Sequence, residues 1–233
     1  MIAIFKREFK AYFSTPIGYI VLAAFYFFLG VYFSIIFGYG APQVPFVIVS
    51  MSSITVFTIP VLTMRLMSED RRQKVDQALL TAPVSLTGIV MGKFLAALAV
   101  VALGFVPTVI FEIIVASLIT VNIVSYIYAL IGILLLSGAL ISIGMFISSL
   151  TESPVVAAII TIIVNFIVLF MSSLTSLINV EWIKAFLNNF DFITAFQSFG
   201  QNVFAIKDII YFASITAFFI FLSVCSLEKR RWS

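Results

Sequence analysis

The sequence predicts an all-α polytopic membrane protein, and its composition and its hydropathy pattern both predict that class. Hydrophobic residues make up 63% of the 233 residues, charged residues only 10%, and the mean hydropathy is +1.22. Soluble domains carry about 25% charged residues, so this chain has too little polar surface to cover a water-soluble globule. Uncharged apolar runs near the roughly 20 residues that a spanning helix needs also recur along the chain. We therefore expect a single membrane domain over residues 1–233 with six transmembrane helices.

The six apolar runs are separated by turns or polar segments. Pro16 precedes the first run, where a proline favours the start of a helix, and Pro60 is expected to kink the second run. The T-E-S-P sequence at 151–154 predicts a tight turn between the fourth and fifth runs. The predicted spans are residues 17–39, 46–64, 94–119, 123–149, 155–178 and 209–227.

Residues 1–16 predict an amphipathic helix that lies in the membrane interface. Its apolar side carries, at helical spacing, Ile2, Phe5, Phe9, Tyr12 and Phe13. Its polar side carries Lys6, Arg7, Glu8 and Lys10, and we expect the three cations to face the lipid headgroups. A signal peptide is not expected, because the following apolar run is too long and no cleavage site of small residues follows it.

The positions of the cations predict the orientation. With six spans both termini lie on one side of the membrane, and that side carries every Lys and Arg of the 13 except Lys184 and Lys207. Loops rich in Lys and Arg stay in the cytoplasm. Both termini are therefore expected to be cytoplasmic.

Residues 65–93, between the second and third spans, form a charged segment that must lie in water or against a soluble partner. Ser68 is expected to cap a helix over about 69–80, because serine is favoured at this position and acidic residues suit the first turn. The helix is expected to end before Pro83. The residues that would contact a partner are Glu69, Asp70, Arg71, Arg72, Lys74, Val75, Asp76 and Leu79. Two interpretations stay open: a solvated helix that fixes topology, or a helix that seats in a groove of an ATPase.

The segment 179–208, between the fifth and sixth spans, predicts short helices that dip into the outer interface. Aromatic side chains recur there at helical spacing and are mixed with amides, a composition typical of the membrane boundary. Phe196 and Phe199 are the candidates for contact with a transported substrate. The alternative is an interfacial plug that never meets substrate.

A few polar and small residues lie inside the predicted spans. Glu112 follows Lys93 by about 28 Å of helix at about 1.5 Å per residue, so it is expected near the outer interface. It would be either a gate or cation contact, or an interface residue that reaches toward water. Asn165 lies in mid-span, where a hydrogen bond between helices competes with substrate contact. Span four carries small residues that suit close helix packing or a dimer seam: Ser137, Gly138, Ser142 and Gly144.

Several motifs give the chain a resemblance to a known family. They are S-E-D-R-R at 68–72, L-L-T-A-P-V-S at 79–85, G-K-F-L at 92–95, F-x-x-F-G at 196–200, D-I-I-Y-F at 208–212 and L-E-K-R-R-W at 227–232. On these motifs the chain resembles the type 2 ABC transporter permeases, most of all the gliding-motility, GldF-like membrane subunits. It departs from that pattern at Lys74-Val75, where the family often has Gly-Thr, and at Gln77, where it often has Glu.

The resemblance implies a permease subunit of an ATP-driven exporter in a prokaryotic inner membrane. Such permeases pair with a second permease subunit, identical or different, and dock a separate nucleotide-binding subunit that binds ATP and Mg. The coupling helix, about 69–80, and the N-terminal helix then carry motion to the spans. Lipid surrounds the domain, an accessory membrane protein is a further partner, and nucleic acid is not expected.

Residue types that are missing from the sequence narrow its chemistry. The chain has no histidine and a single cysteine, Cys225, so an internal disulfide and a His/Cys metal site are both excluded. It also lacks the G-x-x-x-x-G-K-[ST] phosphate loop. We therefore expect no catalytic residues, no cofactor in this chain and ATP hydrolysis in another polypeptide.

Three other functions were weighed against this one. A mechanochemical module that moves no substrate would use the same coupling parts, and the sequence does not separate it from an exporter. An ion-coupled secondary transporter would need an acid near the middle of the membrane. A lipid-modifying enzyme would need clustered acids or histidines. The last two are disfavoured because the spans offer neither arrangement.

Overall fold

The computed structural model describes residues 1–40, 43–73, 85–171, 192–200 and 206–231. Within these ranges every regular element is a helix, and no strand occurs. From the N-terminus the helices are α1 (Ile2–Ser14), α2 (Pro16–Gly38), α3 (Val44–Ser50), α4 (Ser52–Thr63), α5 (Ser68–Arg72), α7 (Leu86–Gly104), α8 (Val106–Ala116), α9 (Ile123–Leu150), α10 (Pro154–Leu169), α13 (Phe192–Gly200) and α14 (Ile206–Arg231). The expectation of an all-helical fold is confirmed for this part of the chain.

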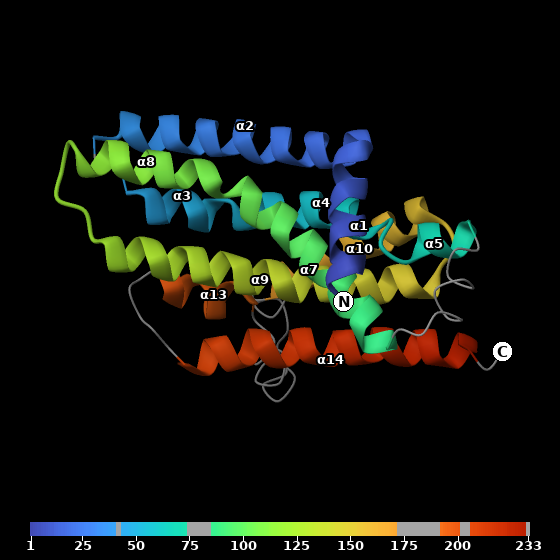
Figure 1. The fold of residues 1–233 in the computed structure, drawn as a ribbon. Helices are drawn as coiled ribbons and strands as arrows, with labels where there is room; N and C mark the ends of the chain where they lie inside the picture. Colours follow the sequence, from blue (N-terminus) through green and yellow to red (C-terminus); the bar gives the residue numbers. More distant parts are fainter. Residues whose placement is uncertain (41–42, 74–84, 172–191, 201–205, 232–233) are drawn as a thin grey trace.

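Helix α9 lies in the centre of the bundle. It contacts α3, α4, α7, α10, α13 and α14, and most of its residues are buried. Figure 1 shows α2, α3 and α8 on one side of α9 and α14 on the other. The N-terminus, α5 and the C-terminal end of α14 lie at one end of the bundle, and the connection between α8 and α9 lies at the opposite end (Figure 1).

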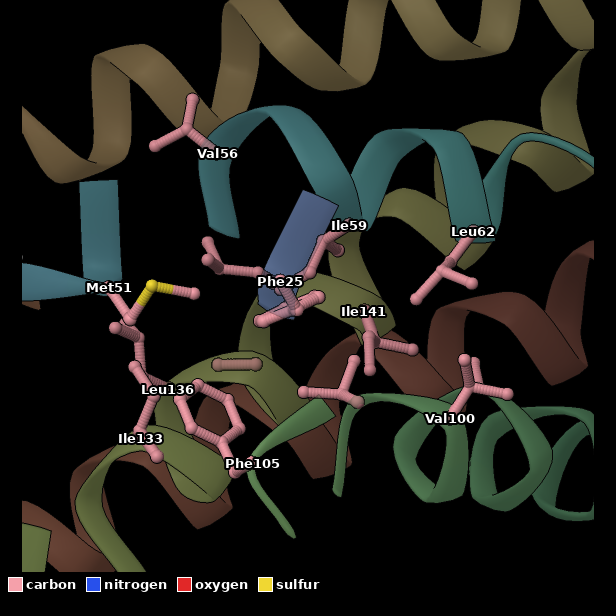
Figure 2. Close-up of a cluster of buried hydrophobic side chains, with 14 of the residues drawn as sticks. Phe25, Met51, Val56, Ile59, Leu62, Val100, Phe105, Ile133, Leu136 and Ile141 are labelled. Atoms are coloured by element: carbon pink, nitrogen blue, oxygen red, sulfur yellow. The ribbon is translucent and has the colours of Figure 1, made fainter. Parts of the chain in front are cut away.

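The core is built from aliphatic and aromatic side chains that meet between α2, α4, α7 and α9 (Figure 2). Phe25 of α2 is fully buried, and its ring meets that of Phe105 edge-on with centroids 5.4 Å apart. Ile59 of α4 and Ile133 and Leu136 of α9 are also completely buried. Because lipid is as apolar as these side chains, close packing rather than exclusion of water holds such helices together.

The small residues of α9 serve packing inside this chain. A methyl group on Gly144 would collide with Thr63 Oγ1 and would lie 2.9 Å from Thr161 Cγ2, so α4, α9 and α10 meet at this glycine. A methyl group on Gly132 would lie 2.8 Å from the Phe199 side chain of α13. Ser137, Gly138 and Ser142 are buried as well. These residues were expected either to allow close packing of helices or to form a dimer seam. The structure shows close packing, because all of them are buried inside this chain.

Four helices of the described part of the chain are long and apolar enough to cross a membrane, and there are five if α3 and α4 form one bent span. Helix α10 is apolar but shorter, and residues 172–178 of the predicted fifth span lie outside the described residues. The chain is thus an integral membrane protein by the length and composition of its helices.

The second span was predicted to kink at Pro60, and the break that the structure shows in it lies nine residues earlier. Helix α4 runs through Pro60, and the 51° bend falls at Met51, between α3 and α4. Here Ser50 Oγ donates to the Phe46 carbonyl at 2.8 Å, and Thr55 Oγ1 donates to the Ser52 carbonyl at 2.5 Å. Hydroxyls that bond back to helix carbonyls in this way bend helices.

The third span was predicted to begin after Lys93, and the helix that contains it begins earlier. Helix α7 begins at Leu86, so Lys93 lies inside it. Only 1% of its surface is exposed, although the sequence placed it in a polar cytosolic segment. A buried lysine is stable only with anionic partners, and these partners form the site described next.

Candidate coupling site

Helix α1 packs against α7 and α2 at the end of the bundle that carries α5 (Figure 1). Its buried side chains are Ile4 and Tyr12, with Glu8 between them on the same face. Of the residues predicted for the apolar face, Tyr12 is buried and Phe5, Phe9 and Phe13 are half-buried against the core, whereas Ile2 is exposed. The rings of Phe5 and Phe9 stack with centroids 5.8 Å apart. The hydrophobic pattern does not show that the contact face also includes the Glu8 carboxylate.

Glycine at position 92 permits this close approach. A methyl group there would lie 3.0 Å from Ile4 Cγ2 and 3.1 Å from the Met1 carbonyl oxygen. These distances are shorter than ordinary van der Waals contacts, so a larger residue would push α1 away from α7. The next residue, Lys93, faces the same joint.

Lys93 joins three elements through ion pairs. Its Nζ lies 3.0 Å from Glu8 Oε1 of α1 and 2.6 Å from Asp70 Oδ2 of α5. Arg7 Nη2 lies 2.5 Å from Glu8 Oε1 and 3.6 Å from Asp70 Oδ2. Two cations and two carboxylates thus form a neutral group, which we call the Lys93 cluster (Arg7, Glu8, Asp70, Lys93). Mutual pairing is what permits buried charges.

The environment of α1 shifts the pKa values of Glu8 and Tyr12 in particular. Burial alone would raise the pKa of the Glu8 carboxyl, but the charges and hydrogen bonds of Lys93 and Arg7 outweigh it and hold that pKa below its usual value of 4.5. Burial raises the pKa of the Tyr12 hydroxyl, which donates to the Leu62 carbonyl at 2.9 Å. Tyr12 therefore fastens α1 to the end of α4 as a neutral donor.

Helix α5 is fixed at its beginning by α9. Ser148 Oγ accepts from the backbone N–H groups of Met67 and Ser68, at 3.2 and 3.1 Å, and donates to the Met64 carbonyl at 3.1 Å. The expectation that Ser68 caps this helix is wrong. Ser68 is the first helical residue, and its hydroxyl donates to the Met64 carbonyl. The cap comes from a residue distant in sequence, which binds the orphan donors in the same way.

The remaining charges of α5 divide into paired and unpaired ones. Glu69 pairs with Arg65, with Nη2 and Oε1 2.7 Å apart. Arg71 pairs with Glu152 of the α9–α10 turn, at 2.8 Å between Nε and Oε1. Arg72 is exposed and has no ion pair with any residue that the structure describes. It is therefore the side chain of α5 available to a partner.

Other predicted coupling residues lie at the margin or outside the described chain. Lys6 and Lys10 are exposed on α1, as expected for cations that face headgroups, and Phe9 is half-buried. Residues outside the described part are Lys74, Val75, Asp76 and Leu79.

A cavity of about 310 Å³ opens between α1 and the α4–α5 segment. Arg7, Glu8 and Tyr12 line it from α1, and Arg65 and Asp70 line it from the other side. Its wall therefore includes three members of the Lys93 cluster, and a side chain that entered it would touch the cluster directly.

The four residues predicted for a gate or substrate path lie away from this site. Glu112 lines a cavity at the other end of the bundle. Asn165 of α10 is completely buried, and its amide has no hydrogen-bond partner in the described structure, so the expected bond between helices is not formed there. Phe196 and Phe199 of α13 are buried, with Phe199 against Gly132 of α9.

Sequence reasoning missed four members of the coupling site: Glu8, Lys93, Ser148 and Glu152. Glu8 was placed on the polar face of the first helix, and Lys93 was taken as the end of a cytosolic segment. A signal for Lys93 was present in the sequence, because residues 86–92 before it carry no charge. An uncharged run on both sides of the lysine indicates a helix that continues through it. Nothing in the local sequence distinguishes Ser148 from the other serines of α9.

No group of three or more His, Cys, Asp or Glu side chains that could hold a metal ion occurs in the described ranges. The Lys93 cluster neutralises itself, and its ion pairs join α1, α5 and α7.

Comparison with known proteins gives the context for this arrangement. Residues 41–227 match the model of a family described as ABC-2 family transporter protein. No curated protein matches the chain. Proteins of this family are the membrane components of ABC transporters and work with an ABC ATPase. Since the match covers most of the 233 residues, the chain belongs to the ABC-2 transporter family and is the membrane-embedded permease component of an ABC transporter.

Proposed function

We propose that this permease is one subunit of an ATP-driven exporter and that it docks a separate ATPase through α5 and the residues that follow it. In this proposal six spans cross a prokaryotic inner membrane with both termini in the cytoplasm. A second permease subunit completes the pathway, and the ATPase binds ATP and Mg. The family assignment supports this proposal. The resemblance of the sequence motifs to the gliding-motility permeases is in keeping with it.

The observation that carries the proposal is the Lys93 cluster. Asp70 belongs to the segment that would meet the ATPase, and it is 2.6 Å from Lys93 in the long helix α7. Glu8 ties α1 to the same ammonium group at 3.0 Å. Separating a buried ion pair costs about 3–5 kcal/mol, so α5, α1 and α7 move together more easily than they come apart. A push on α5 is therefore delivered directly to a membrane-crossing helix.

The docking surface in this proposal is the exposed side of α5. Arg72 is exposed and forms no ion pair with the described residues. Arg71, in contrast, pairs with Glu152, and Asp70 pairs with Lys93. A carboxylate or backbone carbonyl of the ATPase would pair with Arg72. Lys74, Val75, Asp76 and Leu79 would extend the same surface.

The other predicted residues take part in the substrate path under this proposal. Phe196 and Phe199 on α13 would form an apolar wall at the outer end. Asn165, whose buried amide has no partner in the described structure, would meet a polar group during transport. These assignments rest on position and burial, and they are secondary to the coupling site.

The experiment compares charge reversals on α5. The tagged permease is extracted from its own host in mild detergent, the co-purifying ATPase is quantified, and ATPase activity is measured in lipid. Arg72→Glu should lower ATPase recovery by about tenfold or more, as loss of a hot-spot contact does. The exchange Arg71→Glu with Glu152→Arg keeps an internal pair and should retain recovery. The matched control is Lys207→Glu, because Lys207 is exposed at the start of α14.

Two results would overturn the proposal. One is full ATPase recovery and activity with Arg72→Glu. The other is a wild-type chain that purifies alone after gentle crosslinking, because then no ATPase docks on α5.

A further inference from the structure

Another polar cavity lies at the end of the bundle opposite the coupling site. It has a volume of about 240 Å³ and lies between the start of α3, the end of α8 and the connection to α9 (Figure 1). Its polar lining consists of Gln43, Glu112, Thr120, Asn122 and Ser125, and the other lining residues are aliphatic or proline. The coupling site does not use any of these residues.

Glu112 is the unusual member of this cavity. Only 8% of its surface is exposed, and its Oε2 has no hydrogen-bond partner in the described structure. A carboxylate that is buried this far must either hold a proton or meet a cation, because an isolated buried charge is very costly. Among the described residues no Lys or Arg forms an ion pair with it. A cation would therefore have to come from outside the described chain.

We propose that the Glu112 cavity binds a primary ammonium group. One carboxylate balances the single positive charge. A primary ammonium group has three N–H donors in all, and the oxygens of Gln43, Thr120 and Asn122 are acceptors for those that the carboxylate does not bind. The volume is several times the roughly 30 Å³ that one water molecule occupies, so it admits an aminoethyl group. A divalent metal fits poorly, because Ca²⁺ takes 6–8 oxygen ligands and usually several carboxylates.

The lining also distinguishes between kinds of ammonium. Quaternary ammonium groups cannot donate hydrogen bonds and are held by aromatic faces. Among the residues that the structure describes, none of those that line this cavity is aromatic. Its oxygens suit a group that donates N–H bonds, so the cavity should prefer ethanolamine to choline.

The position of the cavity suggests where the ammonium comes from. Ile110, Ile113, Ile114 and Leu118 of α8 and its end are exposed beside it and form an apolar surface suited to lipid chains. A polar cavity at the edge of such a surface lies where headgroups meet a membrane protein. The ammonium of a phosphatidylethanolamine headgroup or a soluble primary amine would supply the same chemistry.

The experiment uses the full permease with whatever subunits co-purify. It is placed in nanodiscs of phosphatidylcholine or of phosphatidylethanolamine mixed with phosphatidylcholine, with an equal anionic fraction in both, and thermal unfolding is followed. We expect phosphatidylethanolamine to raise the Tm by a few degrees. Glu112→Gln should abolish this rise, and Glu112→Asp, which keeps the charge, should retain part of it. Glu228 is an exposed carboxylate at the C-terminal end of α14, and Glu228→Gln should behave as wild type.

A second arm separates the sources. In phosphatidylcholine discs, millimolar ethanolamine, tetramethylammonium and Na⁺ are compared on the wild-type protein. A rise with ethanolamine but not with phosphatidylethanolamine supports the cavity as a site for soluble amines, and a rise with the lipid supports the headgroup. This arm needs no variant, so it decides the matter even if Glu112→Gln does not fold.

Several outcomes would overturn the proposal. They are equal Tm values in both lipids together with no effect of ethanolamine, an equal rise with tetramethylammonium or Na⁺, or an undiminished lipid effect in Glu112→Gln. In those cases the Glu112 carboxyl holds a proton or a simple ion rather than an ammonium group.

Discussion

Lys93 Nζ lies 3.0 Å from Glu8 Oε1, although 85 positions separate the two residues in the chain. The contact brings the first helix against the middle of a long apolar helix and places both beside Asp70. Since only 1% of Lys93 is exposed, its charge depends on these two carboxylates. The joint between α1, α5 and α7 is therefore an electrostatic one inside an otherwise apolar bundle.

Replacing Lys93 should lower the stability of the protein mainly because a buried positive charge is lost. Lys93→Met leaves Glu8 and Asp70 without their buried cation, and removing one partner of a buried pair costs about 3–5 kcal/mol. The double variant Glu8→Gln with Lys93→Met should lose less than the sum of the two single losses, because the pair is already broken. Unfolding in lipid nanodiscs measures both quantities. Lys207→Met is the control, and equal losses from Lys93→Met and Lys207→Met would contradict the buried pairing.

Acidification should loosen α1 through Glu8. The folded-state pKa of Glu8 lies below its usual 4.5, so its contribution to stability is complete above that value and is lost as the pH falls through the folded pKa. The difference in Tm between wild type and Glu8→Gln should therefore be constant near neutral pH and shrink below about pH 4.5. Glu228→Gln should show no such convergence. A difference that stays unchanged down to the acid limit would show that Glu8 is not held charged by Lys93.

Glycine 144 should tolerate no side chain. Gly144→Ala would bring a methyl group into Thr63 and within 2.9 Å of Thr161, and overpacking of this kind costs about 1–3 kcal/mol. Gly30→Ala, where nothing lies within 4 Å, should be neutral or raise stability by up to about 1 kcal/mol. Adding Thr63→Ala to Gly144→Ala should recover part of the loss in the same unfolding assay. Equal effects at the two glycines would refute the close packing of α4, α9 and α10.

Ser148 should control the order of α5. Ser148→Ala removes the acceptor for two backbone N–H groups, and a lost cap costs about 1 kcal/mol. Hydrogen exchange at residues 67–72 should then become faster, with little change elsewhere. Ser142→Ala is the matched control, because Ser142 is buried in the same helix and, among the described residues, its hydroxyl donates to the Ala139 carbonyl of that helix. Protection of residues 67–72 that survives Ser148→Ala would show that the cap is not needed.

The elements of the fold follow the hydropathy pattern closely. The predicted spans 17–39 and 123–149 agree with α2 and α9 to within one residue at each end. Long apolar runs specify such helices because every backbone polar group in lipid must be bonded within the segment. A helix at the N-terminus was also predicted, and α1 is present there. What the sequence did not reveal is that Glu8 lies on the face of that helix that meets Lys93.

The candidate site was harder to predict because its determinants are not local. A lysine after an apolar run is expected to mark the boundary with water, and Lys93 breaks this rule only because Glu8 and Asp70 reach it from distant parts of the chain. The cap of α5 by Ser148 depends in the same way on how α9 packs. The bend at Met51 has a local cause in Ser50 and Thr55, but a proline is the commoner cause, so Pro60 was the natural prediction.

The contact between Glu8 and Lys93 also sets an order for biosynthesis. Ribosomes add about 5–20 residues per second, so the 85 positions between the two residues correspond to about 4 to 17 s of synthesis at that rate. During this interval the first helix has emerged, but its cation does not yet exist. Two other apolar segments, α2 and the α3–α4 pair, are made during the same interval. The start of the protein reaches its final place only after the third apolar segment has been made.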